Sequence, residues 1–528
     1  MTRLSYVAGK WVATGGDSVE ALVPAALEHA RRLGCGAMAR LTFHDRARIV
    51  LRLADYLGAD PEGLYSLSAK VGATRRDAMR DVAGALGVMR GLARATLKDL
   101  PDSTVAPDGP VERSAIPGYS LNLGNQNSPG SAGVRGTSNA GGAATGQHLY
   151  VSPNGVGILV NALNFLLWGS AARLTPAFLA GIPVIIKPAR QTGSVAAELI
   201  RMIALSGLMP PGSLQLLNGQ TETFWDYLKF GDQVCFTGSS QTGLKLAKQP
   251  KVVGGKVRLI LATESVNAAV LGPDQTPGSP GFSALVRCVA REMTTNAGQT
   301  CTAIRRVLVP QQQLKRFTDA LCRHLDRTVV MGDPTDPATS VGPLIDHEQL
   351  RRLNRQVREL VAFGGRVVRG GGRARNAPGP YYEPTVLVFS QPSPVLCDVE
   401  PFGPVVSVAG YGSTAEAIRL SNDGGRSLVI TLASGDWQFL ADMVRGVAPY
   451  HGRVHLLDSS SPEARNGRAS PVGPVSHGGG EELDGVRSIR QWMHRVVIEG
   501  SPSAVLRLTG QTAERAASRD ALTSPSRI

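Results

Sequence analysis

Residues 157–186 read GILVNALNFLLWGSAARLTPAFLAGIPVII, and in them two short apolar runs, GILV and PVII, enclose a stretch at 171–180 with helical character. Short apolar runs of this kind suit strands of a parallel sheet that are buried on both faces. Two further runs, at 234–236 and 268–271, read as a third and a fourth strand. Because strands alternate with helices, this part of the sequence predicts an α/β fold with a doubly wound parallel sheet.

Helical spacing dominates the sequence before this region, and a second α/β section follows it. We expect helices across 19–98, where apolar and charged residues alternate at helical intervals. The apolar residues within 282–293 lie on one face of an expected helix, and strands return at 307–309 and 405–408. Residues 124–146 are rich in Gly, Ser, Asn and Thr, so we interpret them as a mobile surface insertion that buries no core.

Length and composition limit the classes of protein to consider. A chain of 528 residues is longer than one typical core, so we expect two or three domains. The N-terminus has no apolar run of a signal peptide, and Asn161, Asn164, Gly169 and Arg173 interrupt the most apolar stretch. We therefore expect neither secretion nor a membrane span.

Cysteine usage and charge narrow the choice further. The six cysteines show no C-x-x-C spacing, so we expect no disulfide framework, no metal site and a reducing, cytoplasmic location. The formal net charge is +14, but it is scattered rather than gathered in a basic block. This pattern disfavours nucleic-acid binding, whereas an anionic substrate such as a coenzyme A thioester stays compatible with it.

The strongest chemical signal is REMTTNAGQTCTA at 291–303, where a helix is expected to end in a glycine loop before Cys301. Gly298 permits a sharp turn and a close approach of substrate to the backbone. A thiolate at Cys301 would be a good nucleophile toward a carbonyl carbon. A cysteine taken alone is more often a small buried hydrophobic residue, so the surrounding motifs have to decide its role.

The run NAGQTC, 296–301, resembles the nucleophile loop of the aldehyde dehydrogenase superfamily. The segment LATESVN, 261–267, resembles the glutamate motif of that family. The resemblance implies that Cys301 attacks an aldehyde and that Glu264 activates the water that hydrolyses the resulting thioester. The alternative is that Glu264 is an ordinary solvated residue of a loop.

A third motif concerns the oxyanion formed by that attack. The run NALNF, 161–165, resembles the asparagine motif of the family. It implies that the Asn164 amide and the backbone N–H of Cys301 donate hydrogen bonds to the oxyanion. Family members commonly have proline where this chain has Leu166, a difference that removes no donor.

Two motifs imply a nicotinamide cofactor bound through its adenosine and pyrophosphate. IKPA, 186–189, matches the ribose motif of the family, so Lys187 is implied to hydrogen-bond the adenosine ribose. Arg190 follows, where many NAD-preferring members have Glu, and its charge favours NADP, with NAD possible. In FTGSSQTG, 236–243, the residues implied to bind the pyrophosphate at a helix N-terminus are Gly238, Ser239 and Gly243.

The run EPFGPV at 400–405 is a further hallmark of the same family. By resemblance, Glu400 binds the nicotinamide ribose and Phe402 packs near the nicotinamide ring. The simpler reading is a Pro/Gly turn before a strand, which the segment also is.

A finer resemblance and a domain plan follow from these motifs. The segments REMTT, CTAIRR, GATR and GGGEEL resemble a subgroup that oxidises ring-cleavage semialdehydes carried on coenzyme A, so the expected substrate is such an aldehyde. The family resemblance implies a cofactor-binding domain at 1–110 and 151–265, a catalytic domain at 266–475, an oligomerisation extension at 111–150 and 486–510, and a tail at 511–528. That small β extension is expected to join subunits into a homodimer or a higher homo-oligomer.

Three alternatives stay open at this point. Coenzyme A could replace water in an acylating release, although an intact Glu264 favours water. The chain could be an inactive member of the family that serves as a binding or assembly protein, an interpretation that the complete catalytic set disfavours. Nucleic-acid binding through the basic surface would predict a DNA affinity that falls steeply with salt.

Overall fold

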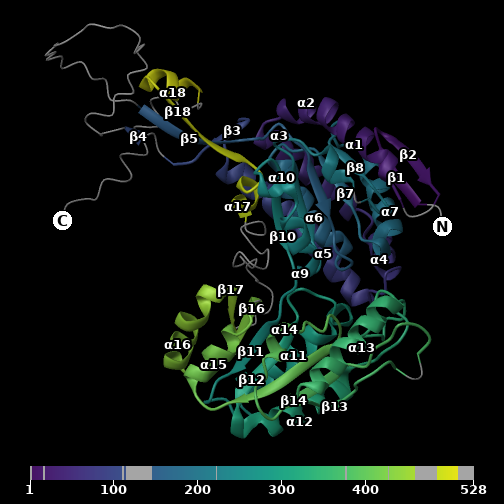
Figure 1. Ribbon diagram of the computed structural model, residues 1–528, viewed down its shortest axis with the longest axis vertical. Coiled ribbons are helices and arrows are strands. Elements are labelled where there is room, and N and C mark those ends of the chain that lie inside the picture. The colour runs from purple at the N-terminus through teal and green to yellow at the C-terminus, as the bar shows by residue number, and fades with distance from the viewer. Residues whose placement is uncertain are drawn as a thin grey trace, which may run out of the picture.

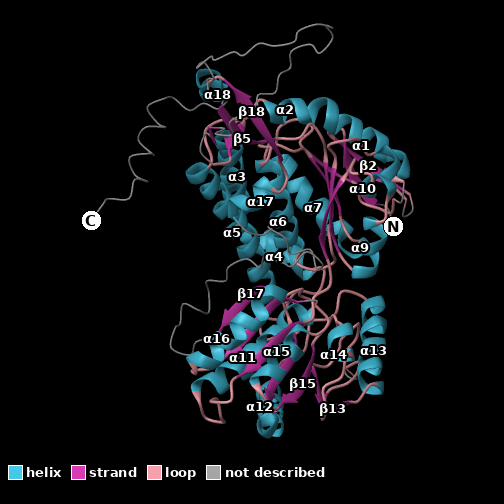
Figure 2. Cartoon of the chain, turned by 60° about the vertical axis from the view of Figure 1, so that its left-hand side comes forward, coloured by secondary structure: helices cyan, strands magenta, loops and turns pink. Residues whose placement is uncertain are grey.

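Two seven-stranded sheets, each covered by helices on both faces, organise the chain (Figure 1). The computed structural model describes residues 3–15, 18–109, 112–113, 145–221, 223–374, 377–425, 427–457 and 485–508. In Figure 1 the lobe built mainly from the N-terminal half lies above the lobe built from β11 onward. Figure 2 shows the same two lobes after rotation, with strands between layers of helices.

The first sheet has the strand order β10-β9-β6-β7-β8-β1-β2. The five strands from β10 to β8 are parallel, and the β1-β2 hairpin joins them antiparallel at the other edge. The strands are β1 (Arg3–Val7), β2 (Lys10–Thr14), β6 (Gly157–Val160), β7 (Val184–Lys187), β8 (Leu214–Leu216), β9 (Gln233–Thr237) and β10 (Arg258–Ala262).

Strand alternation explains why this sheet is wound on both sides. Leu159 and Ile186 pack into a cluster with apolar residues of α3, α4, α5, α6 and α7. Ile158 and Ile185, their neighbours in sequence, pack on the opposite face with residues of α1 and α8. Successive side chains of a strand point to opposite faces, so a strand that is apolar throughout needs helices on both.

The helices of this lobe are α1 (Val23–His29), α2 (Gly36–Ala39), α3 (Phe43–Gly58), α4 (Pro61–Ala69), α5 (Arg75–Asp99), α6 (Leu166–Leu179), α7 (Gly193–Leu205), α8 (Phe224–Tyr227), α9 (Ser240–Ala247), α10 (Pro250–Val253) and α17 (Gly485–Arg490). Local capping fixes several starts. Thr42 and Asp45 form a reciprocal capping box on α3, and the Thr74 side chain accepts a hydrogen bond from the backbone of Asp77 at the start of α5.

The second sheet has the strand order β13-β14-β15-β12-β11-β16-β17, and only β13 runs antiparallel to its neighbour. Its strands are β11 (Asn267–Leu271), β12 (Ile304–Pro310), β13 (Gly365–Arg369), β14 (Thr385–Phe389), β15 (Val405–Tyr411), β16 (Ser427–Ala433) and β17 (His451–Leu456). Its helices are α11 (Pro280–Thr294), α12 (Leu314–Thr328), α13 (His347–Ala362), α14 (Val395–Asp398), α15 (Thr414–Asn422) and α16 (Trp437–Val447). Helices α11 and α12 cover one face, and α13, α15 and α16 the other.

A small third sheet projects from the upper lobe in Figure 1. The strand β5 (Thr145–Val151) pairs antiparallel with β18 (His494–Gly500), with β3 (Val105–Pro107) and with β4 (Glu112–Arg113). Helix α18 (Pro502–Leu508) follows β18. Segments from both ends of the chain thus meet in this sheet.

The fold class predicted from the sequence is confirmed, with three corrections in detail. The run at 268–271 is a strand, β11, but it belongs to the second sheet and not to the sheet of the other three strands. The helix expected at 171–180 begins earlier, at Leu166, because its first turn is stabilised from outside the segment. The strands β1, β2, β8 and β10 of this first sheet were missed, since runs of only three to five residues show little alternation.

Several predictions concern segments outside the described residues. They include 124–144 of the proposed insertion, the run GGGEEL and the tail at 511–528. Within the described segments, no helix is both long and apolar enough to cross a membrane.

Candidate active site

The loop before Cys301 has an unusual backbone. After α11 ends, Asn296 and Ala297 are both left-handed, each with φ of 50°, and Gly298 follows with φ of 71°. A Cβ on Gly298 would lie 2.1 Å from the carbonyl oxygen of Gly403, so only glycine fits. Left-handed residues other than glycine cost energy and persist only where their surroundings hold them. Cys301 lies in the turn that follows, and it is exposed.

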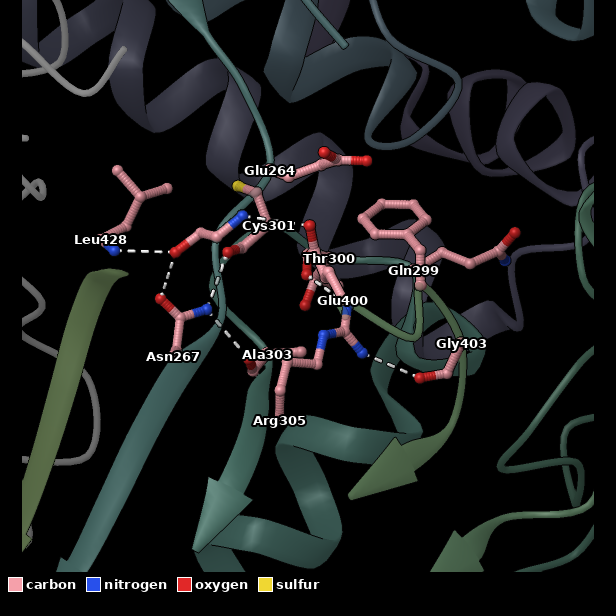
Figure 3. Close-up of polar contacts among 12 residues, drawn as sticks. Glu264, Asn267, Gln299, Thr300, Cys301, Ala303, Arg305, Glu400, Gly403 and Leu428 are labelled. Carbon is pink, nitrogen blue, oxygen red and sulfur yellow. Dashed lines mark hydrogen bonds and ion pairs between the residues drawn. The ribbon is translucent and has the colours of Figure 1, made fainter. Parts of the chain in front are cut away.

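Asn267 holds the backbone on the far side of Cys301 (Figure 3). Its Nδ2 donates to the carbonyl oxygens of Cys301 and Ala303 at 2.8 and 2.9 Å. Its Oδ1 accepts from the Ser265 hydroxyl at 2.7 Å and from the backbone N–H of Val429 at 3.0 Å. Asn267 is 1% exposed, so these bonds are shielded from water and fix the backbone at Cys301.

A buried ion pair joins this loop to the segment around Glu400. Arg305 donates to the carbonyl oxygens of Thr300 and Gly403 at 3.0 and 2.8 Å, and it lies 3.5 Å from Glu400 Oε1. Glu400 Oε2 accepts from the backbone N–H of Ser265 at 3.0 Å. Burial raises the pKa of Glu400 to about 7, and the Arg305 charge opposes that rise. In this structure the carboxylate of Glu400 therefore links its own segment to Ser265 and to Arg305.

Glu264 lies in the segment that joins β10, in the first sheet, to β11, in the second. Its Oε1 accepts from Arg352 Nη2 at 2.6 Å, and its Oε2 accepts from the backbone N–H of Ser240 at 3.1 Å. In Figure 3 its carboxylate points away from the Cys301 sulfur. Glu264 would have to leave Ser240 and Arg352 before it could act on a group bound to Cys301.

The electrostatic surroundings of Cys301 disfavour a resting thiolate. Although the residue is exposed, the protein around its thiol raises the pKa, first through desolvation and next through the negative charge of Glu400. Arg173, on α6, and Arg305 oppose this rise. The resting thiol is therefore mainly protonated at neutral pH.

Asn164 lies between β6 and α6, in the loop that the sequence identified. Its side-chain amide makes no hydrogen bond within the described part of the chain. The neighbouring Asn161, by contrast, donates from Nδ2 to the Ser170 hydroxyl at 3.0 Å. The Asn164 amide is thus available to a ligand.

The residues expected to bind the adenosine and the pyrophosphate follow the carboxyl ends of β7 and β9, the two neighbours of β6 in the first sheet. Lys187 is the last residue of β7, and burial lowers the pKa of its amine, with Arg3 adding to the effect. Arg190 begins the turn after β7 and is exposed. Ligands of open parallel sheets bind at this edge.

The turn expected to bind the pyrophosphate lies between β9 and α9. Ser239 is the N-cap of α9 and accepts from the backbone N–H of Thr242 at 3.3 Å, and the Gly238 N–H donates to the Ala262 carbonyl at 3.0 Å. A Cβ on Gly243 would lie 2.8 Å from Thr263, so glycine lets α9 approach the segment that carries Glu264. The Ser240 hydroxyl is buried without a hydrogen-bond partner. A free hydroxyl and a helix N-terminus fit a pyrophosphate, so the residues present suit a dinucleotide.

The sequence did not assign roles to four residues that the structure brings into the site: Ser265, Asn267, Arg305 and Arg352. Ser265 and Asn267 stand inside the glutamate motif, and Arg305 stands inside the run CTAIRR, so their motifs were visible while their contacts were not. Arg352, on α13, had no motif to mark it. Across the described ranges, no group of three or more His, Cys, Asp or Glu side chains could hold a metal ion.

Comparison with known proteins agrees with this geometry. Residues 3–448 match the Aldehyde dehydrogenase family. The chain is 31% identical to the 3,4-dehydroadipyl-CoA semialdehyde dehydrogenase of Aromatoleum evansii, over 97% of this chain and 98% of that protein.

Solved structures share the fold. Lactaldehyde dehydrogenase from Escherichia coli superposes with a TM-score of 0.77 at 20% identity, covering 94% of this chain and 99% of that one. PnpE in complex with nicotinamide adenine dinucleotide gives a TM-score of 0.76 at 22% identity, covering 95% and 98%. The chain belongs to the aldehyde dehydrogenase family, as an oxidoreductase that acts on aldehydes with NAD or NADP.

Proposed function

We propose that this chain oxidises a coenzyme A-linked semialdehyde from aromatic-ring degradation to its carboxylic acid, by covalent catalysis at Cys301 and with NADP as the preferred acceptor. The observation that carries the proposal is the exposed Cys301, on a loop that Asn267 binds, with an asparagine amide free of hydrogen bonds among the described residues and a carboxylate in the segment that joins the two sheets. These are the nucleophile, oxyanion donor and base that acyl chemistry on a thiol needs.

The proposed aldehyde oxidation proceeds as follows. The Cys301 thiol loses its proton to solvent, the thiolate sulfur bonds to the aldehyde carbon, and the carbonyl oxygen becomes an oxyanion that the Asn164 amide and the Cys301 N–H stabilise. Collapse of this thiohemiacetal expels a hydride and leaves a thioester on the sulfur. The chemistry that a nicotinamide cofactor supplies when bound is acceptance of that hydride. Glu264 then removes a proton from water, which attacks the thioester, releases the acid and restores the thiol.

A pyrophosphate bound at the turn before α9 would affect the position of Glu264. The Ser240 N–H, which now holds the Glu264 carboxylate, is one of the donors that a pyrophosphate would use at the start of α9. A second anion there would repel Glu264. We therefore propose that occupation of this turn removes one of the two contacts that hold Glu264, so that only the ion pair with Arg352 still has to open before the carboxylate can turn toward Cys301.

The preference for NADP rests on Arg190, which is exposed beside Lys187. Replacing Arg190 by glutamate should raise the KM for NADP about 10- to 100-fold, because a hydrogen-bonded charge pair with the 2′-phosphate contributes about 1.5–3 kcal/mol. The KM for NAD should change little. The measurement is the rate of reduced cofactor formation at about 340 nm with each cofactor.

A matched control makes the same charge change elsewhere on the lobe. Arg40 is exposed and, among the described residues, has no ion pair, so Arg40→Glu should leave both KM values unchanged. Equal KM values for NADP in wild type and Arg190→Glu would show that Arg190 does not recognise the 2′-phosphate.

The substrate class rests on the relative named above and on charge near the nucleophile loop. Arg80 donates to the Thr295 hydroxyl at 2.6 Å. Burial lowers the pKa of Arg80, the carboxylates of Asp77 and Glu292 oppose this, and the positive charges of Arg76 and Arg291 add to it, so the cations beside the loop outnumber the carboxylates by three to two. With NADP, kcat/KM should be at least about tenfold higher for a coenzyme A-linked semialdehyde than for a short neutral aldehyde, and should fall with salt. Equal values at all salt concentrations would exclude an anionic substrate.

We also propose the domain plan and the oligomer expected from the sequence. The first sheet ends at Ala262 and the second begins at Asn267, which supports a boundary between cofactor and catalytic domains near 265. The third sheet presents Val497 at 49% exposure on β18. An exposed apolar strand at a sheet edge supports its use in joining subunits into a homodimer or a higher homo-oligomer.

A further inference from the structure

The helix that follows Asn164 has no cap of its own. The N-cap of α6 is Phe165, which is left-handed with φ of 47° and offers no side-chain acceptor. The first N–H groups of a helix have no partner within it, and leaving them buried and unpaired is costly. Another part of the protein has to supply the acceptors.

Asp81 supplies them from α5. Its Oδ1 accepts from the Trp168 N–H at 2.8 Å, and its Oδ2 accepts from the Leu167 N–H at 3.2 Å. Ser68 adds a hydroxyl donor at 3.4 Å. Asp81 is 4% exposed, so the carboxylate is shielded from water and has been placed opposite the positive end of the α6 dipole.

The same face of α5 also reaches the nucleophile loop. Arg80, adjacent to Asp81, donates to the Thr295 hydroxyl at 2.6 Å. Asp77, one turn earlier, is 2% exposed, and its carboxylate interacts with the backbone of Asn296. Residues three and four apart lie on one side of a helix, so α5 holds both loops with neighbouring side chains.

A small buried cavity and a close contact confirm that the three elements meet. The cavity is lined by side chains of α5 and of both loops, among them Asp77, Asp81, Leu163, Phe165, Asn296 and Gln299. One turn further along α5, a Cβ on Gly84 would lie 2.5 Å from the Trp168 ring, so the first turn of α6 rests directly on this helix.

From this arrangement we infer that Asp81 is a positioning residue for aldehyde oxidation. By capping α6 from α5, it fixes Asn164, next to the N-cap, relative to the loop that carries Cys301. The inference rests on the proposed function, because it takes Asn164 as the oxyanion donor. Burial raises the pKa of Asp81 to about 6, so the carboxylate is still mainly ionised at neutral pH and acts as a charged acceptor.

Asp81→Asn tests the role with a side chain of the same shape. Asparagine keeps one oxygen acceptor but turns an NH₂ group toward the second backbone N–H, so the start of α6 loosens. A misplacement of about 1 Å can cost about 100-fold in rate, so kcat should fall roughly 10- to 100-fold. The KM for NADP should stay within about threefold, since the cofactor residues are on other elements. Asparagine has the same shape and carries no charge that burial would penalise, so the variant is expected to fold.

A double-mutant cycle with Asn164→Ala separates positioning from general destabilisation. If Asp81 acts through Asn164, then Asp81→Asn should lower kcat by less than about threefold in the Asn164→Ala background. If the two substitutions instead lowered kcat by factors that multiply, Asp81 would act independently of the oxyanion donor, and the inference would be wrong.

Amide hydrogen exchange of the peptide 163–169 reports how firmly the start of α6 is held, and it can be measured without enzyme activity. Exchange there should quicken in Asp81→Asn. Asp45→Asn is the matched control, since Asp45 accepts from the Thr42 N–H at 3.1 Å at the start of α3, and it should leave both this exchange and kcat unchanged. Unchanged exchange in Asp81→Asn overturns the inference even if the enzyme is inactive. Absence of turnover in folded wild type with every aldehyde would instead contradict the proposed function, and the exchange result would then decide the capping role alone.

Discussion

Replacing Cys301 by alanine is expected to remove aldehyde oxidation, with a loss of about 10,000-fold or more in kcat. Asn164 and the backbone N–H of Cys301 remain in this variant, but an oxyanion donor cannot replace the bond between sulfur and carbon. The measurement is reduced cofactor formed at about 340 nm under saturating aldehyde.

The fold should survive this substitution. Cys301 is exposed, and Asn267 binds its backbone carbonyl rather than its side chain, so the thermal midpoint should match that of wild type. Cys322, a partly buried thiol on α12, provides the control, because Cys322→Ala should keep near-normal turnover. A Cys301→Ala protein that retains a tenth of the wild-type rate would rule out Cys301 as the nucleophile.

Replacing Glu264 by glutamine should stop turnover after one cycle. Thioester hydrolysis loses its base, and general-base catalysis contributes about 100- to 10,000-fold, so steady-state kcat should fall by that factor. Acylation of Cys301 does not need this carboxylate. We therefore expect a rapid burst of about one reduced cofactor per active site, followed by a slow rate, in stopped-flow absorbance.

The control for this variant is Glu348→Gln. Glu348 is exposed in the first turn of α13, the helix that also carries Arg352. It makes no ion pair within the described segments, so its loss should leave both phases intact. If Glu264→Gln turned over at the wild-type rate, another group would have to be the base, whereas loss of the burst would place Glu264 in an earlier step.

The fold class could be read from the sequence because its signals are local. The runs at 157–160 and 183–186 are apolar throughout, and strands of this kind are buried on both faces wherever they occur. Which sheet a strand joins is not local. The run at 268–271 has the same appearance as the others, yet it pairs with β12 and β16, which come far later in the chain.

The start of α6 shows the same limit at the level of one residue. Phe165 and Leu166 carry no capping signal, and the acceptors that stabilise this start come from Asp81, 86 residues from Leu167. A reading based on the segment alone therefore placed the helix too late. Propensity and capping rules describe neighbours in sequence, whereas this cap depends on tertiary contact.

The candidate site divides in a similar way. Cys301, Glu264 and Asn164 stand in motifs whose spacing is visible in the sequence, and the structure places them in the loops that join adjoining strands and helices. The contacts that brace them could not be read in advance. Arg305 meets Glu400 across 95 residues, and Arg352 meets Glu264 across 88. Such pairs depend on how the two sheets are assembled.

Intact-protein mass spectrometry of Glu264→Gln can detect the proposed covalent intermediate on Cys301. The protein is mixed with aldehyde and NADP, quenched in acid and weighed, and a digest locates any adduct. We expect a mass gain equal to the acyl group of the aldehyde less the thiol hydrogen that it replaces, at about one per chain, on the peptide that contains Cys301 and absent without NADP. If Cys301 stayed unmodified in protein that has produced its burst of reduced cofactor, the proposed covalent catalysis at Cys301 would be wrong.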